Sequence, residues 1–303
     1  MKSFVLAVMG LLCCMSVSAE DFEVDGIYYN ITTDNTVAVT SGYYGSYSGE
    51  VKIPESVTYS GETYSVTSIG DETFSNCWYL TSVEIPNSVT SICESAFGDC
   101  RSLTSVEIPN SVTSIGEGAF VGCSSLTSVE IGNSVTSIGD HAFEDCSSLT
   151  SVEIPNSVTS IGFAAFYECS ILASVEIGNS VTSIGDHAFE DCKKLKKLIS
   201  YAEVPPVCGW AVFYGVNTQE CTLQVPEKSI SAYQQADQWK DFLFIEGVPT
   251  AIGGITVDGA VPATADVYST SSMLIKRNAD LKNLKHELPA GVYIIGGKKV
   301  YVR

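Results

Sequence analysis

The hydrophobic positions of this chain return with a fixed period. From Ser65 to Cys192 a block of about 23 residues recurs almost unchanged. It reads SVTSIGEGAFVGCSSLTSVEIGN from Ser111 and SVTSIGDHAFEDCSSLTSVEIPN from Ser134. A repeat of this length predicts a solenoid, in which each unit buries its apolar face only against its neighbours.

The pattern inside one unit predicts two short strands and a turn segment. In Leu-Thr-Ser-Val-Glu-Ile the last three residues alternate between inward and outward positions, as a half-buried strand requires. The second strand, within Ser-Val-Thr-Ser-Ile, is followed by a glycine such as Gly139, where we expect a tight turn with positive φ. The segment from Asp140 to Cys146 has room for about one helical turn with Phe143 and Cys146 buried.

Stacked units form a parallel sheet whose apolar ends need covering. We therefore predict a β-rich α/β repeat fold of about six repeats with a cap at each end. The N-terminal cap includes a hairpin from Tyr59 to Tyr64, and the C-terminal cap includes a short helix from Ser229 to Phe244. The predicted parts are a signal peptide (1–19), an N-terminal cap (20–64), the solenoid (65–198), a C-terminal cap (199–248) and a small β tail (249–303).

The first residues have the layout of a Sec-type signal peptide. Lys2 precedes an apolar stretch from Phe4 to Met15, and small residues follow up to Ala19, after which we predict cleavage. A lipoprotein signal at Cys13 or Cys14 is the alternative, but bulky residues precede both cysteines. This leader predicts a secreted or outer-surface protein, and the mature chain has no apolar run long enough for a membrane span.

The charge is strongly acidic. The net charge is −19, and Arg101 is the sole Lys or Arg between Ser65 and Cys192. Such a surface repels phosphates and anionic lipid, so nucleic acid is excluded as a partner. One outward column is a candidate partner-binding stripe, with plain solvation of the sheet as the alternative. Its members are Glu84, Glu107, Glu130, Glu153 and Glu176.

The cysteines form a column of their own. Without Cys-x-x-Cys pairs the column does not predict a metal site, and we expect buried free thiols. Cys208 and Cys221 lie outside the column, and an oxidising exterior would allow a disulfide between them. The column comprises Cys77, Cys100, Cys123, Cys146, Cys169 and Cys192.

Catalytic chemistry has little support in this chain. His141 and His187 lie beside carboxylates, but other repeats replace them, which favours exposed and variable turn residues over metal ligands. There is no Ser nucleophile elbow, no phosphate loop and no carboxylate pair outside the repetition. We predict a protein that is not an enzyme and that uses no cofactor and no metal.

Two resemblances add to these predictions. The pattern Leu-x-x-Val-x-Ile-Pro-x-x-Val-x-x-Ile-Gly-x-x-Ala-Phe-x-x-Cys, from Leu103 to Cys123, resembles the BspA-like leucine-rich repeat, and the likeness covers roughly residues 22–248. The resemblance implies a leucine-rich repeat solenoid, secreted or attached to the surface of Bacteroidetes-type bacteria. Some members of that family are adhesins for host matrix proteins or other cells.

The tail carries the second resemblance. The segment from Leu288 to Ile295, with Gly297 to Val300, looks like the C-terminal signal of type IX secretion, although Ser271-Ser272-Met273 stands where a glycine turn is usual. The alternative is a small β-module.

The sequence thus predicts an exported, monomeric, non-enzymatic leucine-rich repeat protein of the bacterial surface that binds protein or glycan. The alternatives are an accessory binding protein for carbohydrate handling and a structural spacer.

Overall fold

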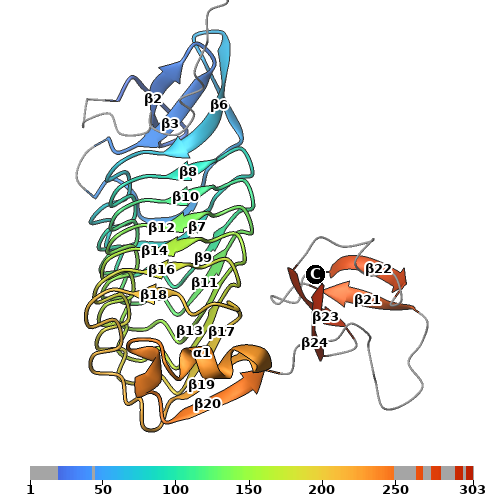
Figure 1. Ribbon diagram of the computed structural model, residues 1–303. Coiled ribbons are helices and arrows are strands. Elements are labelled where there is room, and N and C mark those ends of the chain that lie inside the picture. The colour runs from blue at the N-terminus through green and yellow to red at the C-terminus, as the bar shows by residue number, and fades with distance from the viewer. Residues whose placement is uncertain are drawn as a thin grey trace, which may run out of the picture. The chain divides into compact units, whose positions relative to one another are not determined.

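The computed structural model describes residues 20–42 and 45–248, and the backbone of four strands between residues 264 and 302. The predicted signal peptide lies outside these residues. The chain divides into two compact units, between Glu246 and Gly247. The first is a β-solenoid of about eight stacked turns, each of which we call a rung, so the predicted repeat fold is confirmed. The rungs follow one another along a single axis (Figure 1).

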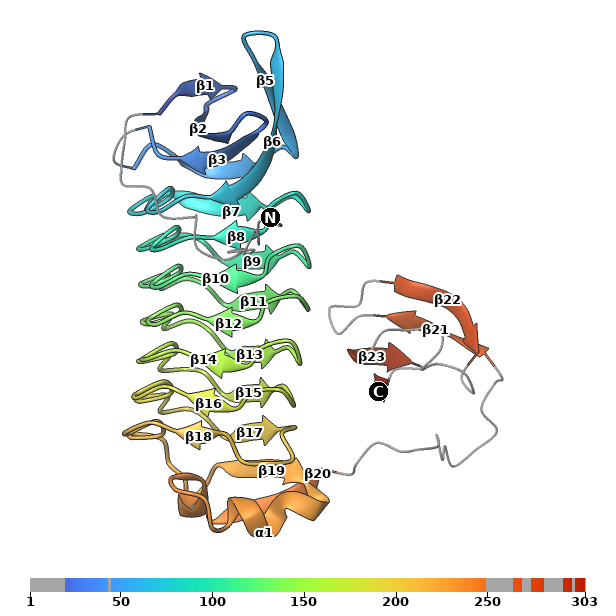
Figure 2. The ribbon, with the colours of Figure 1, turned by 45° about the horizontal axis from the view of Figure 1, so that its top comes forward.

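Two long sheets run along the solenoid (Figure 2). The first consists, in spatial order, of β1 (Phe22–Val24), β2 (Ile27–Thr33), β3 (Thr36–Thr40), β6 (Glu62–Ile69), β8 (Ser91–Ile92), β10 (Ser114–Ile115), β12 (Ser137–Ile138), β14 (Ser160–Ile161), β16 (Ser183–Ile184) and β18 (Val207–Cys208), with β5 (Ser56–Tyr59) beside β6. The second consists of β9 (Ser105–Ile108), β11 (Ser128–Ile131), β13 (Ser151–Ile154), β15 (Ser174–Ile177), β17 (Lys197–Ser200), β19 (Thr222–Pro226) and β20 (Phe244–Val248). Separately, β4 (Gly49–Lys52) pairs in parallel with β7 (Leu80–Glu84).

Equivalent residues of successive rungs pair with one another. Ser128 and Val129 of β11 lie opposite Ser105 and Val106 of β9, in parallel register. Threonine side chains strengthen this register, because the Thr136 backbone N–H and Oγ1 both donate to the Thr113 carbonyl, at 2.9 and 3.1 Å. Each rung is therefore tied to the previous one at a repeated position, and a slip by one residue would break every such bond.

Each rung contributes a short strand such as β12 to the first sheet and a longer strand such as β13 to the second sheet. The segment between these two strands, such as Gly139 to Cys146, forms a third side, which we call the turn side. The predicted helical turn is wrong here. Two residues of each segment adopt positive φ, for example His141 at 57° and Asp145 at 56°, and this interrupts a right-handed helix. Alternate N–H groups instead donate to the next rung, as from Phe143 to the Ala165 carbonyl at 2.8 Å.

Glycine is required after the short strands for a different reason from the predicted one. Positive φ falls two residues later, at Ser95, Gly118, His141, Ala164 and His187, and not at Gly116, Gly139, Gly162 or Gly185. A Cβ on Gly139 would lie 2.6 Å from the Gly116 carbonyl carbon in the previous rung. Glycine is required because two backbones approach too closely for a side chain between them.

The core is a set of side-chain ladders inside this frame. Phenylalanine rings from Phe74 to Phe189 stack with centroids 4.8 to 5.3 Å apart, all of them completely buried. At the N-terminal end Tyr47 tilts by 49° against Phe74. At the C-terminal end Phe213 meets Trp239 edge-on at 5.1 Å. The change of ring orientation ends the stack, so neither end presents a flat apolar face.

The caps follow the prediction only in part. The hairpin is confirmed, because β5 and β6 pair in antiparallel register from Tyr59 and Glu62. The predicted helix from Ser229 to Phe244 is mostly wrong. The structure has only η1 (Glu227–Ser229), α1 (Ile230–Tyr233) and η2 (Trp239–Asp241) in this segment. Trp239 anchors it by donating from Nε1 to the Pro206 carbonyl at 2.8 Å.

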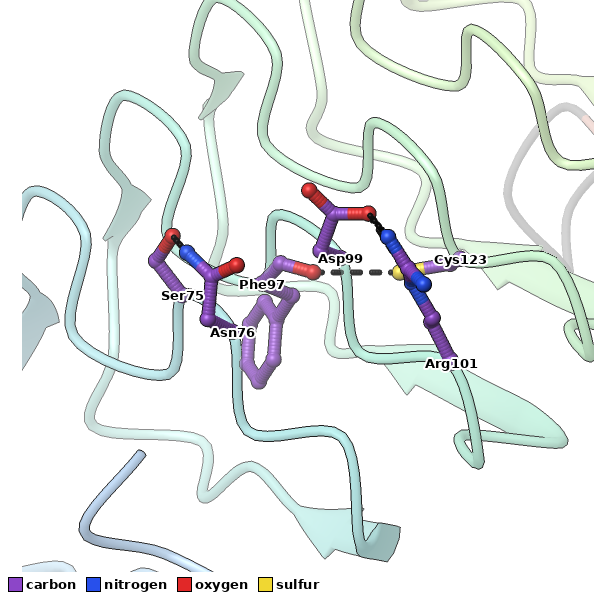
Figure 3. Close-up of polar contacts among 6 residues, drawn as sticks. All are labelled: Ser75, Asn76, Phe97, Asp99, Arg101 and Cys123. Carbon is purple, nitrogen blue, oxygen red and sulfur yellow. Dashed lines mark hydrogen bonds and ion pairs between the residues drawn. The ribbon is translucent and has the colours of Figure 1, made fainter. Parts of the chain in front are cut away.

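The cysteine column is buried and its thiols are free, as expected. From Cys100 to Cys192 each Sγ of the column donates to a phenylalanine carbonyl of the previous rung, as Cys123 does to Phe97 at 3.1 Å (Figure 3). Burial raises the pKa of the Cys146 and Cys169 thiols well above the usual value. These side chains act as small hydrophobic groups with one weak hydrogen bond each.

The second unit contains one antiparallel sheet. Its strands lie in the order β22 (Leu274–Asp280), β21 (Thr264–Tyr268), β23 (Gly291–Ile295) and β24 (Lys298–Val302). A small β-module and a type IX signal share this description, so the sorting role stays a prediction.

Replacing Gly139 by alanine should lower the free energy of unfolding by about 1–3 kcal/mol, because the new methyl group overpacks against the Gly116 backbone. Urea unfolding followed by circular dichroism measures this. Gly98→Ala is the matched control, since its Cβ would approach nothing closer than the Ser95 carbonyl oxygen at 3.3 Å. Equal losses in the two variants would contradict the close-approach explanation.

Alkaline pH should destabilise the fold through the buried thiols. Burial raises the pKa of Cys208 from 9.0 to about 12 and that of Cys221 to about 11. Above pH 9 the unfolded chain therefore loses thiol protons that the folded chain retains, and stability falls as pH rises, by about 1.4 kcal/mol per pH unit for each such thiol. Unfolding of the reduced protein at pH 8.5 and 10 measures the slope. Cys146→Ala should have a shallower slope, and an unchanged slope would contradict this origin.

Candidate functional site

The structure brings the five predicted glutamates onto one outward face of the long strands. Glu107 lies directly opposite Glu130, and Glu153 lies opposite Glu176. The column consists of Glu84, Glu107, Glu130, Glu153 and Glu176, and we call it the glutamate column. Carboxylates on directly opposite parallel positions form a row of like charges that the rigid sheet holds in place.

Residues outside the repeat close both ends of the glutamate column. Lys52 of β4 forms an ion pair with Glu84 at 2.9 Å, and the Tyr201 hydroxyl donates to Glu176 Oε2 at 2.9 Å. Both members of the Lys52 pair are largely exposed, so the pair contributes at most about 1 kcal/mol. Sequence reasoning missed these two contacts because neither residue belongs to the periodic pattern.

The turn side carries a second line of outward residues, which we call the aromatic ladder: His141, Phe163, His187 and Trp210. Their ring centroids are 4.9, 5.4 and 4.8 Å apart in succession, and each pair meets edge-on. Both histidines lie in turns, as predicted, but they are half-buried, and the structure places them in one row with the exposed rings of Phe163 and Trp210. The sequence did not reveal this row, because the four residues of the row alternate between two neighbouring positions of the repeat unit.

Carboxylates crowd the same side. Burial and the neighbouring Glu168 raise the pKa of the Asp145 carboxyl, with smaller contributions from Glu144 and Asp99. Glu144 and Glu190 are hydrogen-bonded to Nδ1 of His141 and His187 respectively. Even so, the described residues contain no group of three or more His, Cys, Asp or Glu arranged to hold a metal ion.

The proposed disulfide gains no support from the geometry. Cys208 and Cys221 are both free thiols in the structure. Cys208 belongs to β18 of the first sheet, whereas Cys221 precedes β19 of the second. A bond between them stays a prediction.

The part of the chain that the structure describes has no helix with the length and apolar character of a membrane span.

Comparison with known proteins identifies the repeat. A family model described as the BspA type leucine-rich repeat region matches in six copies, over residues 67–196 and 159–249. Among solved structures, a leucine-rich repeat protein from Bacteroides ovatus is 26% identical, with a TM-score of 0.47, over 75% of this chain and 67% of that chain. A leucine-rich cell surface protein from Faecalibacterium prausnitzii is 28% identical, with a TM-score of 0.49, over 77% of this chain and 73% of that chain.

No curated protein sequence matches the chain. The family model nevertheless spans more than half of its length, and the matched range contains the buried ladders that build the rungs. The chain therefore belongs to the family of proteins with BspA-type leucine-rich repeats.

Proposed function

We propose that this protein is an exported, non-enzymatic binding protein of the bacterial surface, and that the glutamate column contacts a basic protein partner. The proposal depends on the two glutamates in the middle of the column, Glu107 and Glu130. Within the described residues, no Lys or Arg forms an ion pair with Glu107 or Glu130. Two in-register carboxylates without a counter-charge favour a partner that supplies one.

The rigidity of the sheet supports a binding role. Val106 and Ile108 beside Glu107 are buried in the core, and beside Glu130 Val129 is buried while Ile131 is partly buried against the core. The backbone of this face is held by the parallel pairing of β9 with β11, in which Glu107 lies opposite Glu130. Binding to such a surface costs little conformational entropy, because the surface is ordered beforehand.

The cellular setting rests on the sequence. The leader up to Ala19 and the resemblance of the repeat to a surface-attached family favour export, and the tail favours sorting or anchoring at the outer surface. A scaffold made of ladders supplies surface rather than a catalytic cleft. A monomer that presents one long face agrees with this role.

The test is charge reversal in the middle of the column. Glu107→Lys with Glu130→Lys should weaken binding to the partner found on an array of extracellular matrix proteins and glycans by about ten-fold. Surface plasmon resonance at low and physiological salt measures the loss, which should shrink as salt rises.

The control carries the same change in net charge at the N-terminal cap, as Glu55→Lys with Glu62→Lys, both exposed residues away from the column. The proposal requires the control to bind nearly as well as the parent protein. Undiminished binding by the column variant, or an equal loss in both variants, would overturn the assignment to the glutamate column.

A further inference from the structure

The aromatic ladder is a second outward surface, on a different side from the glutamate column. Phe163 is 39% exposed and Trp210 is 71% exposed, whereas the phenylalanine rings of the core have no exposure. Large aromatic rings in a line on the surface of a solenoid contribute nothing to the stacking of its core. Their exposure is a cost in solubility that a ligand would offset.

The residues of the ladder are held in position by hydrogen bonds, two of them from the previous rung and two from within their own rung. The Asp140 Oδ1 atom accepts from the Phe163 backbone N–H at 2.7 Å, and Asp186 Oδ1 accepts from Trp210 N–H at 2.7 Å. Glutamates three residues along hold the two histidine rings by a hydrogen bond at Nδ1. The row is thus ordered before any ligand arrives, which lowers the entropic cost of binding.

The surroundings of the ladder are acidic and short of cations. Asp145, Glu168 and Asp191 occupy equivalent positive-φ positions in three successive rungs, four or five residues after the ladder residues of the same turn segments. Among the described residues, Lys193 forms an ion pair with Asp191 of this row, with 3.4 Å between Nζ and Oδ1. Like charges crowd around Asp145, whose pKa is raised by burial and by Glu168. An added cation would relieve this repulsion.

The described residues contain a cation held between a ring and a carboxylate on this same side, although its ring, Trp78, lies at a different position of the unit from the ladder. The Arg101 guanidinium lies 5.5 Å from the centre of the Trp78 ring and 3.1 Å from Asp99 Oδ1 (Figure 3 shows the Asp99 contact). Asp99 has a φ of 55° and occupies in its rung the position that Asp145 and Asp191 occupy later. Arginine is therefore already held here between an exposed ring and Asp99, the carboxylate equivalent to Asp145 in an earlier rung.

The repeat does not supply that arginine again beside the ladder. The equivalents of Arg101 in the following three rungs are Ser124, Ser147 and Ser170. Rings and carboxylates are thus present near Phe163 without a guanidinium from this chain. Arginine suits both groups, because its planar cation stacks on aromatic faces and pairs with carboxylates.

We propose that the aromatic ladder, with the carboxylates of Asp145 and Glu168 beside it, binds an arginine-rich segment of a partner protein. The guanidinium groups lie against the exposed rings of Phe163 and Trp210 and pair with the acidic row. This surface is independent of the glutamate column, so either surface can fail its test without affecting the other.

The experiment compares fluorescently labelled hexa-arginine and hexa-lysine peptides by anisotropy with the full chain. Hexa-arginine should bind several-fold more tightly, because lysine lacks the planar stacking surface. Phe163→Ala with Trp210→Ala should weaken hexa-arginine binding by roughly five- to thirty-fold and leave hexa-lysine nearly unchanged. Thermal unfolding checks the fold, and Trp210→Ala alone answers the question if the double variant is destabilised.

Two controls separate this surface from others. Tyr79→Ala removes an aromatic side chain that is 75% exposed outside the ladder, and it should leave binding unchanged. Glu107→Lys with Glu130→Lys should affect both peptides alike, since it changes only the general field. Equal affinity for the two peptides, or an unaffected double variant, would overturn the proposal. Binding of a neutral hexasaccharide in place of either peptide would also overturn it, in favour of a glycan.

Discussion

Every rung of this solenoid has a near-copy of itself as its neighbour, about 5 Å away, and the rest of the structure depends on that constraint. A side chain in the core must pack against the same side chain twice. Flat rings satisfy this condition, and Phe97 and Phe120 lie 5.0 Å apart with only 2° between their planes. A thiol also satisfies it, because a small Sγ fits under the next rung and still donates to a phenylalanine carbonyl. The core is therefore a set of ladders rather than one interlocking cluster.

The same constraint explains what the backbone does at the glycines and on the turn side. Where two rungs come closest, no side chain fits between them, as at Gly116 and Gly139. On the turn side the N–H groups must reach the next rung, which a helix would prevent by using them internally. Residues such as His141 and Asp145 accept positive φ in order to keep these bonds, and the bonds gained from rung to rung offset that local strain.

Outside the core the same constraint arranges outward side chains in rows. Whatever side chain occupies an outward position returns at the spacing of the rungs, so one glutamate becomes a row and two histidines with two aromatic residues become another. A row offers a partner several equal contacts, and weak contacts that are linked in this way add to a useful affinity. Non-repeating residues decide where each row ends. Lys52 and Tyr201 close the glutamate column, and Trp239 closes the core.

The sequence by itself determined the architecture, because the period, the alternation of Val, Glu and Ile, and the apolar columns depend only on which residue follows which. It also determined that the cysteines are buried and that Glu107 and Glu130 share a face. Only the tertiary structure decided the rest. The reason for Gly139 and the row from His141 to Trp210 depend on atoms of different rungs, which no reading of a single unit contains. The helix expected from Ser229 became short turns because Trp239 and Tyr233 had to reach the last rung, and packing against that rung outweighed local preference.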